Sequence, residues 1–240
     1  MERQRVNLQP AFLLHQSPYR DSSRLLDVFS RDHGRIGLVA RGARRPKARL
    51  RAVLQPFQPL LLSWSARTDL GTLTGAEIVL GMPQLPSNRI YSAYYMNELL
   101  LRLTRRHVAH PGLFDHYADA LRDLGGECTE SRALRLFEKR LLDELGYGLD
   151  LRHTVDGAAV REDGNYEYRL EQGVIQADPM HGAAQVYCGR SLLALASETL
   201  EEDLAVRDAR RLLSAALDQH LGPRPLEVRR VARAMRRALR

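Results

Sequence analysis

The sequence has few cysteines and no long apolar run, and each absence narrows the class of protein. Cys128 and Cys188 are its two cysteines, and neither has a second cysteine nearby. A disulfide framework is therefore not expected, and a reducing compartment fits. No stretch approaches the ~18 uninterrupted apolar residues of a membrane span. The charged residues 1–5 lead into no signal-type apolar block, so we expect a cytoplasmic protein without a membrane partner.

Motifs of enzymes and of metal sites are also missing. The sequence contains no Gly-x-Ser-x-Gly, no Walker A loop and no Gly-x-Gly-x-x-Gly. His107, His110 and His116 lie close together in the sequence, but no HExxH or paired CxxC frames them. The carboxylates of residues 127–171 show no pairing and are better explained as a solvated acidic face. We therefore predict no catalytic residue, no cofactor and no metal site.

Positive charge is unevenly distributed along the chain. The net charge is +7, and only Lys47 and Lys139 among the 36 basic residues are lysines. Residues 1–80 carry a net charge of +7, residues 81–223 carry −6, and residues 224–240 carry +6. A basic head and a basic tail around an acidic middle indicate a polyanionic partner that binds at particular places. Guanidinium groups suit such a partner because they fork onto phosphate and stack on bases.

The first 82 residues have the pattern of a small β-barrel. Short apolar or alternating runs, bounded by turn residues, predict five strands. The runs are residues 11–15, 23–29, 35–40, 60–64 and 70–74. Five short strands in this length are typical of an OB-fold barrel. We therefore expect residues 1–82 to form an OB-fold domain.

The pattern changes to helical spacing after the prolines at residues 83–86. Apolar residues at helical intervals predict helices. The first predicted helix begins near residue 88. Further helices are predicted at residues 113–124, 131–145, 190–196 and 206–221. Residues 151–188 lose this periodicity and predict a loop-rich insertion with a hairpin near residues 166–168. The expected fold is thus α+β, with a helical domain at residues 83–225 and a basic tail at residues 226–240.

The densest positive charge lies between residues 31 and 51, where eight basic residues accompany Asp32 alone. Gly42 and Pro46 favour a loop over a helix. Because clustered like charges repel, an anionic ligand explains them better than a solvated surface loop does. We therefore predict a DNA contact made by Arg35, Arg41, Arg44, Arg45, Lys47, Arg49 and Arg51.

Aromatic residues of the same region could stack on bases. Phe57 and Trp64 are better explained as core residues, whereas Tyr19, expected in a loop beside Arg20, is a candidate for stacking. The segment 229–240 could form a basic amphipathic helix that touches nucleic acid or a membrane surface, but a solvated tail is the favoured interpretation.

Several stretches together resemble the RecO family of recombination mediators. They are residues 11–15 (AFLLH), 25–30 (LLDVFS), 33–35 (HGR), 38–44 (LVARGAR), 54–60 (LQPFQPL), 95–100 (YMNELL), 134–138 (LRLFE) and 145–149 (LGYGL). No single stretch is diagnostic, but their order and spacing are specific. The resemblance implies a non-enzymatic, nucleoid-associated protein that binds single- and double-stranded DNA and anneals complementary strands. It also implies three partners: the C-terminal tail of single-stranded-DNA-binding protein (SSB), RecR and, indirectly, RecA.

The resemblance also bears on zinc. Many RecO-like proteins carry a four-cysteine zinc site after the LGYG motif. Here His153 and Cys188 are the remaining candidate ligands of that segment. Two ligands are too few for a tetrahedral site, so we predict that the chain binds no zinc.

A receptor for the SSB tail needs an apolar pocket with guanidinium groups at its rim. The predicted helix 131–145 places Arg132, Arg135 and Lys139 along one edge, beside an apolar stripe. The stripe is Leu134, Phe137 and Leu141. Arg135 also occupies the place of an arginine in the family's Leu-Arg-x-Phe-Glu pattern. The alternative is that Arg135 and Lys139 only pair with acids such as Glu138 and Asp143.

Two other classes remain open. One is an OB-fold nucleic-acid enzyme, such as a nuclease whose scattered carboxylates bind magnesium. The other is a general RNA-binding module. Incubation of labelled DNA with magnesium separates cleavage from annealing, and competition by RNA separates the second alternative.

Overall fold

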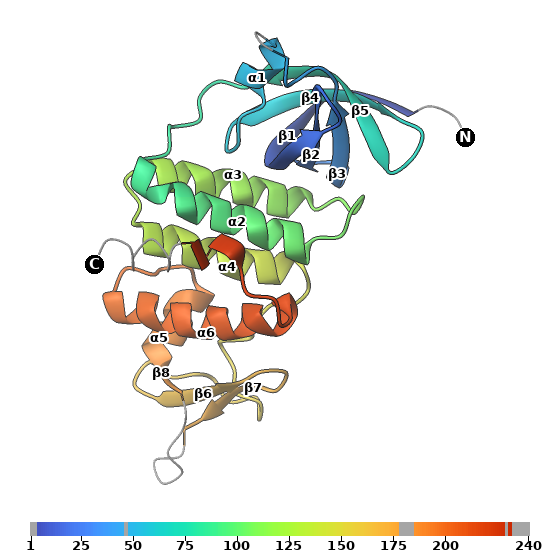
Figure 1. Ribbon diagram of the computed structural model, residues 1–240. Coiled ribbons are helices and arrows are strands. Elements are labelled where there is room, and N and C mark those ends of the chain that lie inside the picture. Colours follow the sequence, from blue (N-terminus) through green and yellow to red (C-terminus); the bar gives the residue numbers. More distant parts are fainter. Residues whose placement is uncertain (1–3, 46–47, 178–184, 229, 232–240) are drawn as a thin grey trace. The chain divides into compact units, whose positions relative to one another are not determined.

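The computed structural model describes residues 4–45, 48–177, 185–228 and 230–231. A β-barrel comes first and is followed by helices and a small sheet, as the α+β prediction required (Figure 1). The chain forms two compact units. The first contains residues 1–127 and 225–240, and the second contains residues 128–224. This division differs from the boundary expected at residue 82, because the first two long helices pack with the barrel.

Five strands close the barrel in the order β1-β2-β3-β5-β4, which is the arrangement of an OB-fold. The pairing is antiparallel except between β3 and β5. The strands are β1 (Gln4–Tyr19), β2 (Ser23–Ser30), β3 (Gly34–Ala40), β4 (Pro59–Ala66) and β5 (Leu70–Ile78), with helix α1 (Arg49–Val53) between β3 and β4. Strand β1 begins earlier than predicted because its first half pairs with β4 and its second half with β2.

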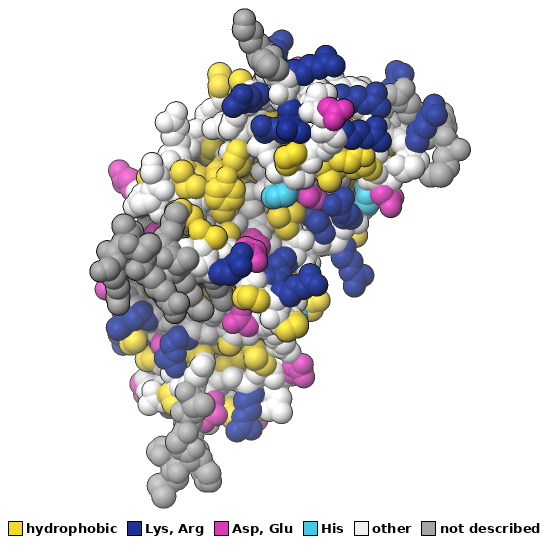
Figure 2. Space-filling view, in the orientation of Figure 1, with side chains coloured by type: hydrophobic (Ala, Val, Ile, Leu, Met, Phe, Trp, Pro, Cys, Tyr) yellow, Lys and Arg dark blue, Asp and Glu magenta, His cyan; other side chains and the backbone are white. Residues whose placement is uncertain are grey.

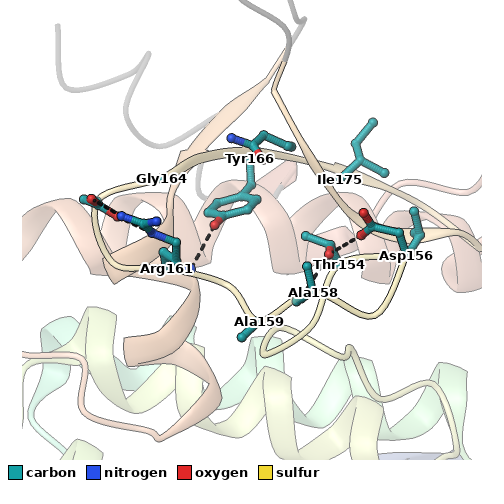
Figure 3. A pocket seen from close by; sticks show the side chains of 11 residues that line it. Thr154, Asp156, Ala158, Ala159, Arg161, Gly164, Tyr166 and Ile175 are labelled. Carbon is teal, nitrogen blue, oxygen red and sulfur yellow. Dashed lines mark hydrogen bonds and ion pairs between the residues drawn. The ribbon is translucent and has the colours of Figure 1, made fainter.

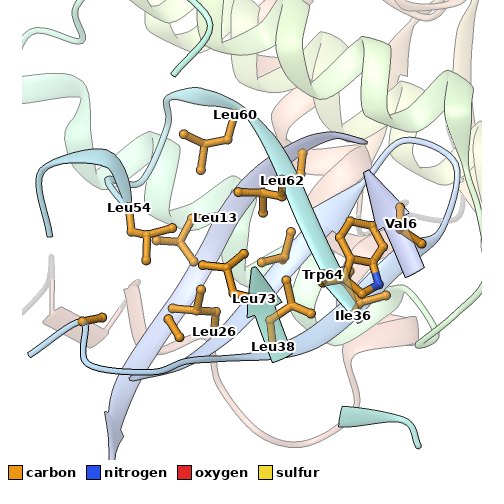
Figure 4. Packing of buried hydrophobic residues seen from close by; sticks show 14 residues of the cluster. Val6, Leu13, Leu26, Ile36, Leu38, Leu54, Leu60, Leu62, Trp64 and Leu73 are labelled. Atoms are coloured by element: carbon orange, nitrogen blue, oxygen red, sulfur yellow. The ribbon is translucent and has the colours of Figure 1, made fainter. Parts of the chain in front are cut away.

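The interior of the barrel is closed at its two ends by different residues (Figure 4). Leu54, which follows α1, is 1% exposed and lies at one end of the core with Leu13 and Leu26. Trp64 is 5% exposed and lies at the other end with Ile36. Trp64 is therefore a core residue, as the sequence predicted, but one at the mouth of the barrel.

Helices α2 (Ile90–Leu103) and α3 (Pro111–Gly125) follow a short 3-10 turn, η1 (Ser87–Arg89), and pack against the barrel. The ring centroid of Phe12 lies 5.2 Å from that of Phe114 and 5.0 Å from that of Tyr117. Asn97 Nδ2 donates to the carbonyl of Leu14 at 2.9 Å, and the Tyr117 hydroxyl donates to Asn97 Oδ1 at 2.5 Å. These buried contacts tie both helices to strand β1.

The second unit combines three helices with a three-stranded sheet. The helices are α4 (Glu130–Glu144), α5 (Gly189–Ala196) and α6 (Asp203–Leu221), and the sheet order is β7-β6-β8, from β6 (Asn165–Arg169), β7 (Gly173–Gln176) and β8 (Val186–Cys188). Helix α4 begins after Thr129, whose hydroxyl accepts from the Arg132 amide, and Gly146 follows it at φ +80°. The predicted helices and the predicted hairpin are thus confirmed.

After α6 the chain returns to the first unit. Leu226 is 3% exposed, and both oxygens of the Glu98 carboxylate accept backbone amides, from Glu227 at 2.8 Å and from Val228 at 3.0 Å. A carboxylate that caps the first amides of a helical turn is stabilising. The tail beyond residue 231, for which a solvated form was favoured, lies outside the described residues. No helix in the described ranges is long and apolar enough to cross a membrane.

Candidate nucleic-acid interface

One end of the barrel gathers exposed arginines from two connections. The β1–β2 turn lies beside the start of the β3–β4 connection because β2 pairs with both β1 and β3, with Tyr19 opposite Ser23 and Arg24 opposite Ala40. We call this end, made of residues 19–24, 41–45 and 48–51, the basic end. Its exposed cations are Arg20, Arg41, Arg44, Arg45, Arg49 and Arg51, and Arg24 is half-buried.

The β3–β4 connection is anchored rather than loose where it leaves the barrel. Ala43 is fully buried in the barrel core, and Gly42 adopts φ +68° in the turn that precedes it. The Arg44 amide donates to Ser22 O at 2.9 Å, and Arg44 Nη1 donates to Arg20 O at 3.1 Å. These bonds hold Arg44 against the β1–β2 turn.

The arginines of the basic end have little acidic compensation. Within the described ranges, no ion pair involves Arg20, Arg41, Arg44, Arg45, Arg49 or Arg51. Asp21 is an exposed acid in the same turn. Figure 2 shows Lys and Arg side chains gathered over the barrel on the face drawn. An array of unpaired guanidinium groups at one place suits a row of phosphates.

The structure places Tyr19 differently from the sequence prediction. Tyr19 is the last residue of β1 rather than a loop residue, and it is half-buried. The guanidinium of Arg20 lies 5.3 Å from the centroid of its ring. Arg20 has φ +50°, an uncommon conformation for a residue with a side chain. The ring therefore already stacks against a cation of the same turn.

Arg49 and Arg51 also differ from expectation, because they lie on helix α1 and not in a loop. Leu50 and Val53 pack against the barrel core, which leaves Arg49 and Arg51 on the exposed side. Apolar residues every three positions thus favour the short helix, a pattern hidden by the surrounding arginines. Lys47, which was predicted to join this site, lies outside the described residues.

Arg35 is not brought to the basic end. It stands at the start of β3, at the opposite end of the strand. Arg35 Nη2 donates to Thr104 O at 3.0 Å, and Nη1 lies 3.9 Å from Asp27. Burial, followed by the nearby charge of Arg106, lowers the pKa of Arg35. Proximity in sequence grouped Arg35 with the other arginines, but the length of β3 separates them.

Two arginines of the basic end were not among the DNA contacts predicted from the sequence. Arg20 and Arg24 lie before the arginine-rich stretch of residues 31–51 and outside it, so charge density along the chain does not reveal them. The signal that could have found them is the β-hairpin. Once β1 and β2 are paired through a tight turn and β2 with β3, residues 20–24 must adjoin residue 40.

In the second unit, helix α4 buries much of the expected SSB-tail rim. Arg135 is 7% exposed, and its Nη2 lies 2.6 Å from Oε1 of Glu138, which is 2% exposed. Lys139 Nζ lies 2.8 Å from Asp143 and 3.3 Å from Glu198. Phe137 and Leu141 of the apolar stripe are buried, while Leu134 and Arg132 are half-buried. The ion pairs named in the alternative interpretation are therefore both present.

The insertion between α4 and α5 surrounds a cavity of about 520 Å³ (Figure 3). Among the residues that line it, the Tyr166 hydroxyl accepts from the Arg161 amide at 2.8 Å, and Arg161 pairs with Asp163 at 2.9 Å. His153 pairs with Asp150, and the Cys188 thiol lies 3.6 Å from Glu162 O. Among the described residues, no three His, Cys, Asp or Glu side chains gather as a metal site would require. The absence of zinc stays a prediction.

The barrel topology and the arginine-rich end define a basic OB-fold protein with a helical C-terminal part. Comparison with known families agrees with this class. The family described as "Recombination protein O N terminal" matches residues 5–82, and "Recombination protein O C terminal" matches residues 87–230.

Individual relatives point to the same family. Proteins named DNA repair protein RecO from Ralstonia nicotianae, an Azoarcus species and Alkalilimnicola ehrlichii are each 44% identical to this chain. The matches cover 95%, 95% and 100% of this chain, and 84%, 96% and 96% of the relatives. The chain belongs to the RecO family of DNA repair proteins.

Proposed function

We propose that the protein is a recombination mediator. It binds single- and double-stranded DNA through the basic end of its barrel and anneals complementary strands. It also helps RecA to load on SSB-coated DNA, with RecR as a partner. It acts without catalysing a reaction, and a mediator of this kind would work in the cytoplasm, at the nucleoid. Membership in the RecO family supports this function.

The observation that carries the proposal is the convergence of two connections at the basic end. Arg44 joins them through its bonds to Ser22 and Arg20, so exposed cations of both lie at the same end of the barrel. Phosphate contacts of this kind supply affinity without reading sequence. Binding without sequence preference is what a protein that anneals arbitrary strands requires.

The most informative experiment measures annealing of two complementary strands, each coated with SSB. The proposal expects the protein to accelerate annealing of coated strands, and DNA labelled at its ends to stay intact when magnesium is added. Cleavage of the labelled DNA would instead favour the nuclease alternative. Competition by RNA at the same concentration as DNA would favour a general RNA-binding module.

For the SSB tail we propose helix α4 of the second unit as receptor, with Arg132 as its most useful probe. Arg132 is half-buried, and its Nε has no hydrogen-bond partner in the part of the chain that the structure describes. A carboxylate of the tail would pair with the part of this guanidinium that remains exposed. Arg132→Gln should weaken binding of an SSB-tail peptide while binding of naked DNA stays intact. Unchanged peptide affinity would place the receptor elsewhere.

A further inference from the structure

The end of the barrel opposite the basic end carries a second cavity, of about 380 Å³. Three segments surround it: the β2–β3 turn with His33, the β4–β5 turn with residues 67–69, and the α2–α3 loop with His107. Trp64 also lines it. We call this end the open end. Its volume falls in the range of small-molecule binding sites, and it is large enough for part of a nucleotide.

The α2–α3 loop is built into this end of the barrel. Arg106 forms a parallel bridge with Arg35, and the His107 amide donates to Arg35 O at 3.0 Å. Gly34 has φ +64°, and a Cβ at this position would lie 1.9 Å from Val108 O. The close approach of the loop therefore requires glycine at residue 34. His107 itself has φ +61°, a conformation that costs energy in most residues and persists where the surroundings impose it.

Aromatic surface and small residues shape the interior of the cavity. The His33 ring meets the Trp64 ring edge to face, with centroids 5.2 Å apart. Gly71 lies beside Trp64, where a Cβ would come within 2.8 Å of Leu38 Cδ2 and 3.3 Å of Trp64 Cδ1. Any side chain at residue 71 would crowd the indole, so the glycine leaves room for Trp64 at this end of the barrel. Rings in an OB-fold groove are the common platform for unpaired bases.

The charges of the open end fit a base inside and a phosphate at the rim. Arg67 is exposed and has no ion pair within the described ranges. Asp32 and Asp69 also line the cavity, and Asp32 accepts from Gln9 Nε2 at 2.7 Å. Carboxylates would repel a phosphate inside the cavity, but they accept hydrogen bonds from the exocyclic amine of cytosine. The guanidinium of Arg67 would then hold a backbone phosphate.

We infer that the open end is a second site for single-stranded DNA, which receives an unpaired, amine-bearing base of a strand other than the one at the basic end. This inference rests on the proposed function, because annealing requires two strands on one protein. The two ends are separated by the length of β3, whose seven residues span roughly 20 Å. About 4 nucleotides that stay stacked cover only about 10 Å, so an oligonucleotide of this length could reach both ends only if its bases unstack.

The probe is an oligocytidine of about 4 nucleotides, the short end of the site size of an OB-fold. Trp64 is the single tryptophan of the chain, so its emission reports on the open end alone. Binding should change this emission in the wild-type chain and in the basic-end variant Arg44→Gln/Arg45→Gln. The open-end variant Arg67→Gln/His107→Asn should lose the change and bind at least about tenfold more weakly there. Asparagine at residue 107 tolerates the positive φ.

Stoichiometry and annealing complete the test. The wild-type chain should bind two oligonucleotides, and each double variant should bind one. The open-end variant should anneal complementary strands more slowly but still bind a single strand at the basic end. A matched control, Arg152→Gln/His153→Asn, removes an exposed arginine and an exposed histidine from the second unit. It should leave emission, stoichiometry and annealing unchanged.

Four results would overturn the inference. They are a stoichiometry of one in the wild-type chain, an emission change that survives in the open-end variant, equal affinity of the open end for oligocytidine and oligothymidine, and normal annealing by a variant that has lost the second oligonucleotide. A wild-type chain that binds two oligonucleotides but anneals no strands would contradict the proposed function and leave the site standing.

Discussion

The guanidinium of Arg44 donates to the backbone carbonyl of Arg20 at 3.1 Å and so joins two connections at one end of the barrel. The bond leaves the side chain of Arg20 exposed and in contact with the ring of Tyr19. It uses one of the five N–H donors of Arg44, and the others stay available to a ligand. Arg44 is thus held in place beside Arg20, which would reduce the ordering cost of the DNA binding that we propose for the basic end.

Replacing Arg20 should lower the affinity for DNA without a large change in the stability of the fold. Arg20→Gly relieves the cost of φ +50°, but it also gives the unfolded chain more freedom, and each effect is worth about 0.5–1 kcal/mol. We expect the melting temperature to stay within a few degrees of the wild-type value while affinity for single-stranded DNA falls several-fold. Thermal unfolding and fluorescence anisotropy measure the two effects. Full DNA affinity in this variant would exclude Arg20 from the interface.

The buried pair of Arg135 and Glu138 should contribute mainly to folding. Arg135→Ala leaves the Glu138 carboxylate, which is 2% exposed, without its guanidinium partner, and we expect a loss of about 3–5 kcal/mol in the free energy of unfolding. The apolar double variant Arg135→Met/Glu138→Leu should recover most of this loss. Denaturant unfolding followed by circular dichroism measures both. If Arg135→Ala leaves the free energy of unfolding unchanged, the pair of Arg135 and Glu138 must be accessible to solvent in solution.

The stability of the second unit should also depend on Glu198. Burial alone would raise the pKa of Glu198, but hydrogen bonds and charge from Arg140 and Lys139 outweigh it and lower the pKa below its usual value. A carboxylate with a lowered folded-state pKa stabilises the fold above its unfolded pKa of about 4.3. That stability disappears as the pH falls through the folded pKa.

Glu198→Gln should therefore be less stable than the wild-type chain at pH 7, and the difference should vanish in acid. Unfolding curves between pH 7 and about pH 3 for both chains provide the comparison. Glu171→Gln, an exposed carboxylate of the same unit, is the control. A stability difference that is constant over this range would mean that the charge of Glu198 does not matter.

The insertion should hold its shape without a metal. Zinc needs four ligands, whereas the candidate ligands of this segment are His153 and Cys188. In the structure His153 pairs with Asp150, and the Cys188 thiol contacts the carbonyl of Glu162. Protein purified without an affinity tag should contain far less than one zinc per chain, and a chelator should leave its melting temperature unchanged. A full equivalent of zinc that resists the chelator would contradict the prediction.

The barrel could be predicted from the sequence because each strand carries its own apolar alternation and turn residues. The helices of the second unit were predicted for the same reason, since their stripes and terminal glycines are local signals, as at Gly146. The packing of α2 and α3 on the barrel could not be predicted. It depends on Asn97 and Tyr117, polar residues whose partners lie far away in the sequence.

The candidate site was predicted only in part, for a similar physical reason. Charge density grouped Arg41, Arg44 and Arg45, which do lie together in both sequence and structure, and their contact with DNA stays a prediction. It wrongly grouped Arg35 with them, since an extended strand carries neighbours in sequence to opposite ends of a barrel. It missed Arg20, which strand pairing alone brings to Arg44.

The salt dependence of DNA binding tests the role of the basic end most directly. Affinity for single-stranded DNA should be compared between the wild-type chain, the triple variant Arg44→Gln/Arg45→Gln/Lys47→Gln, and a matched control. The control Arg152→Gln/Arg207→Gln/Arg210→Gln removes the same charge from exposed positions of the second unit. Each lost phosphate contact should reduce the slope of log affinity against log salt concentration by roughly 0.7–0.9. The account predicts a slope reduced by roughly 2 in the first variant and unchanged in the control; equal slopes in all three proteins would contradict it.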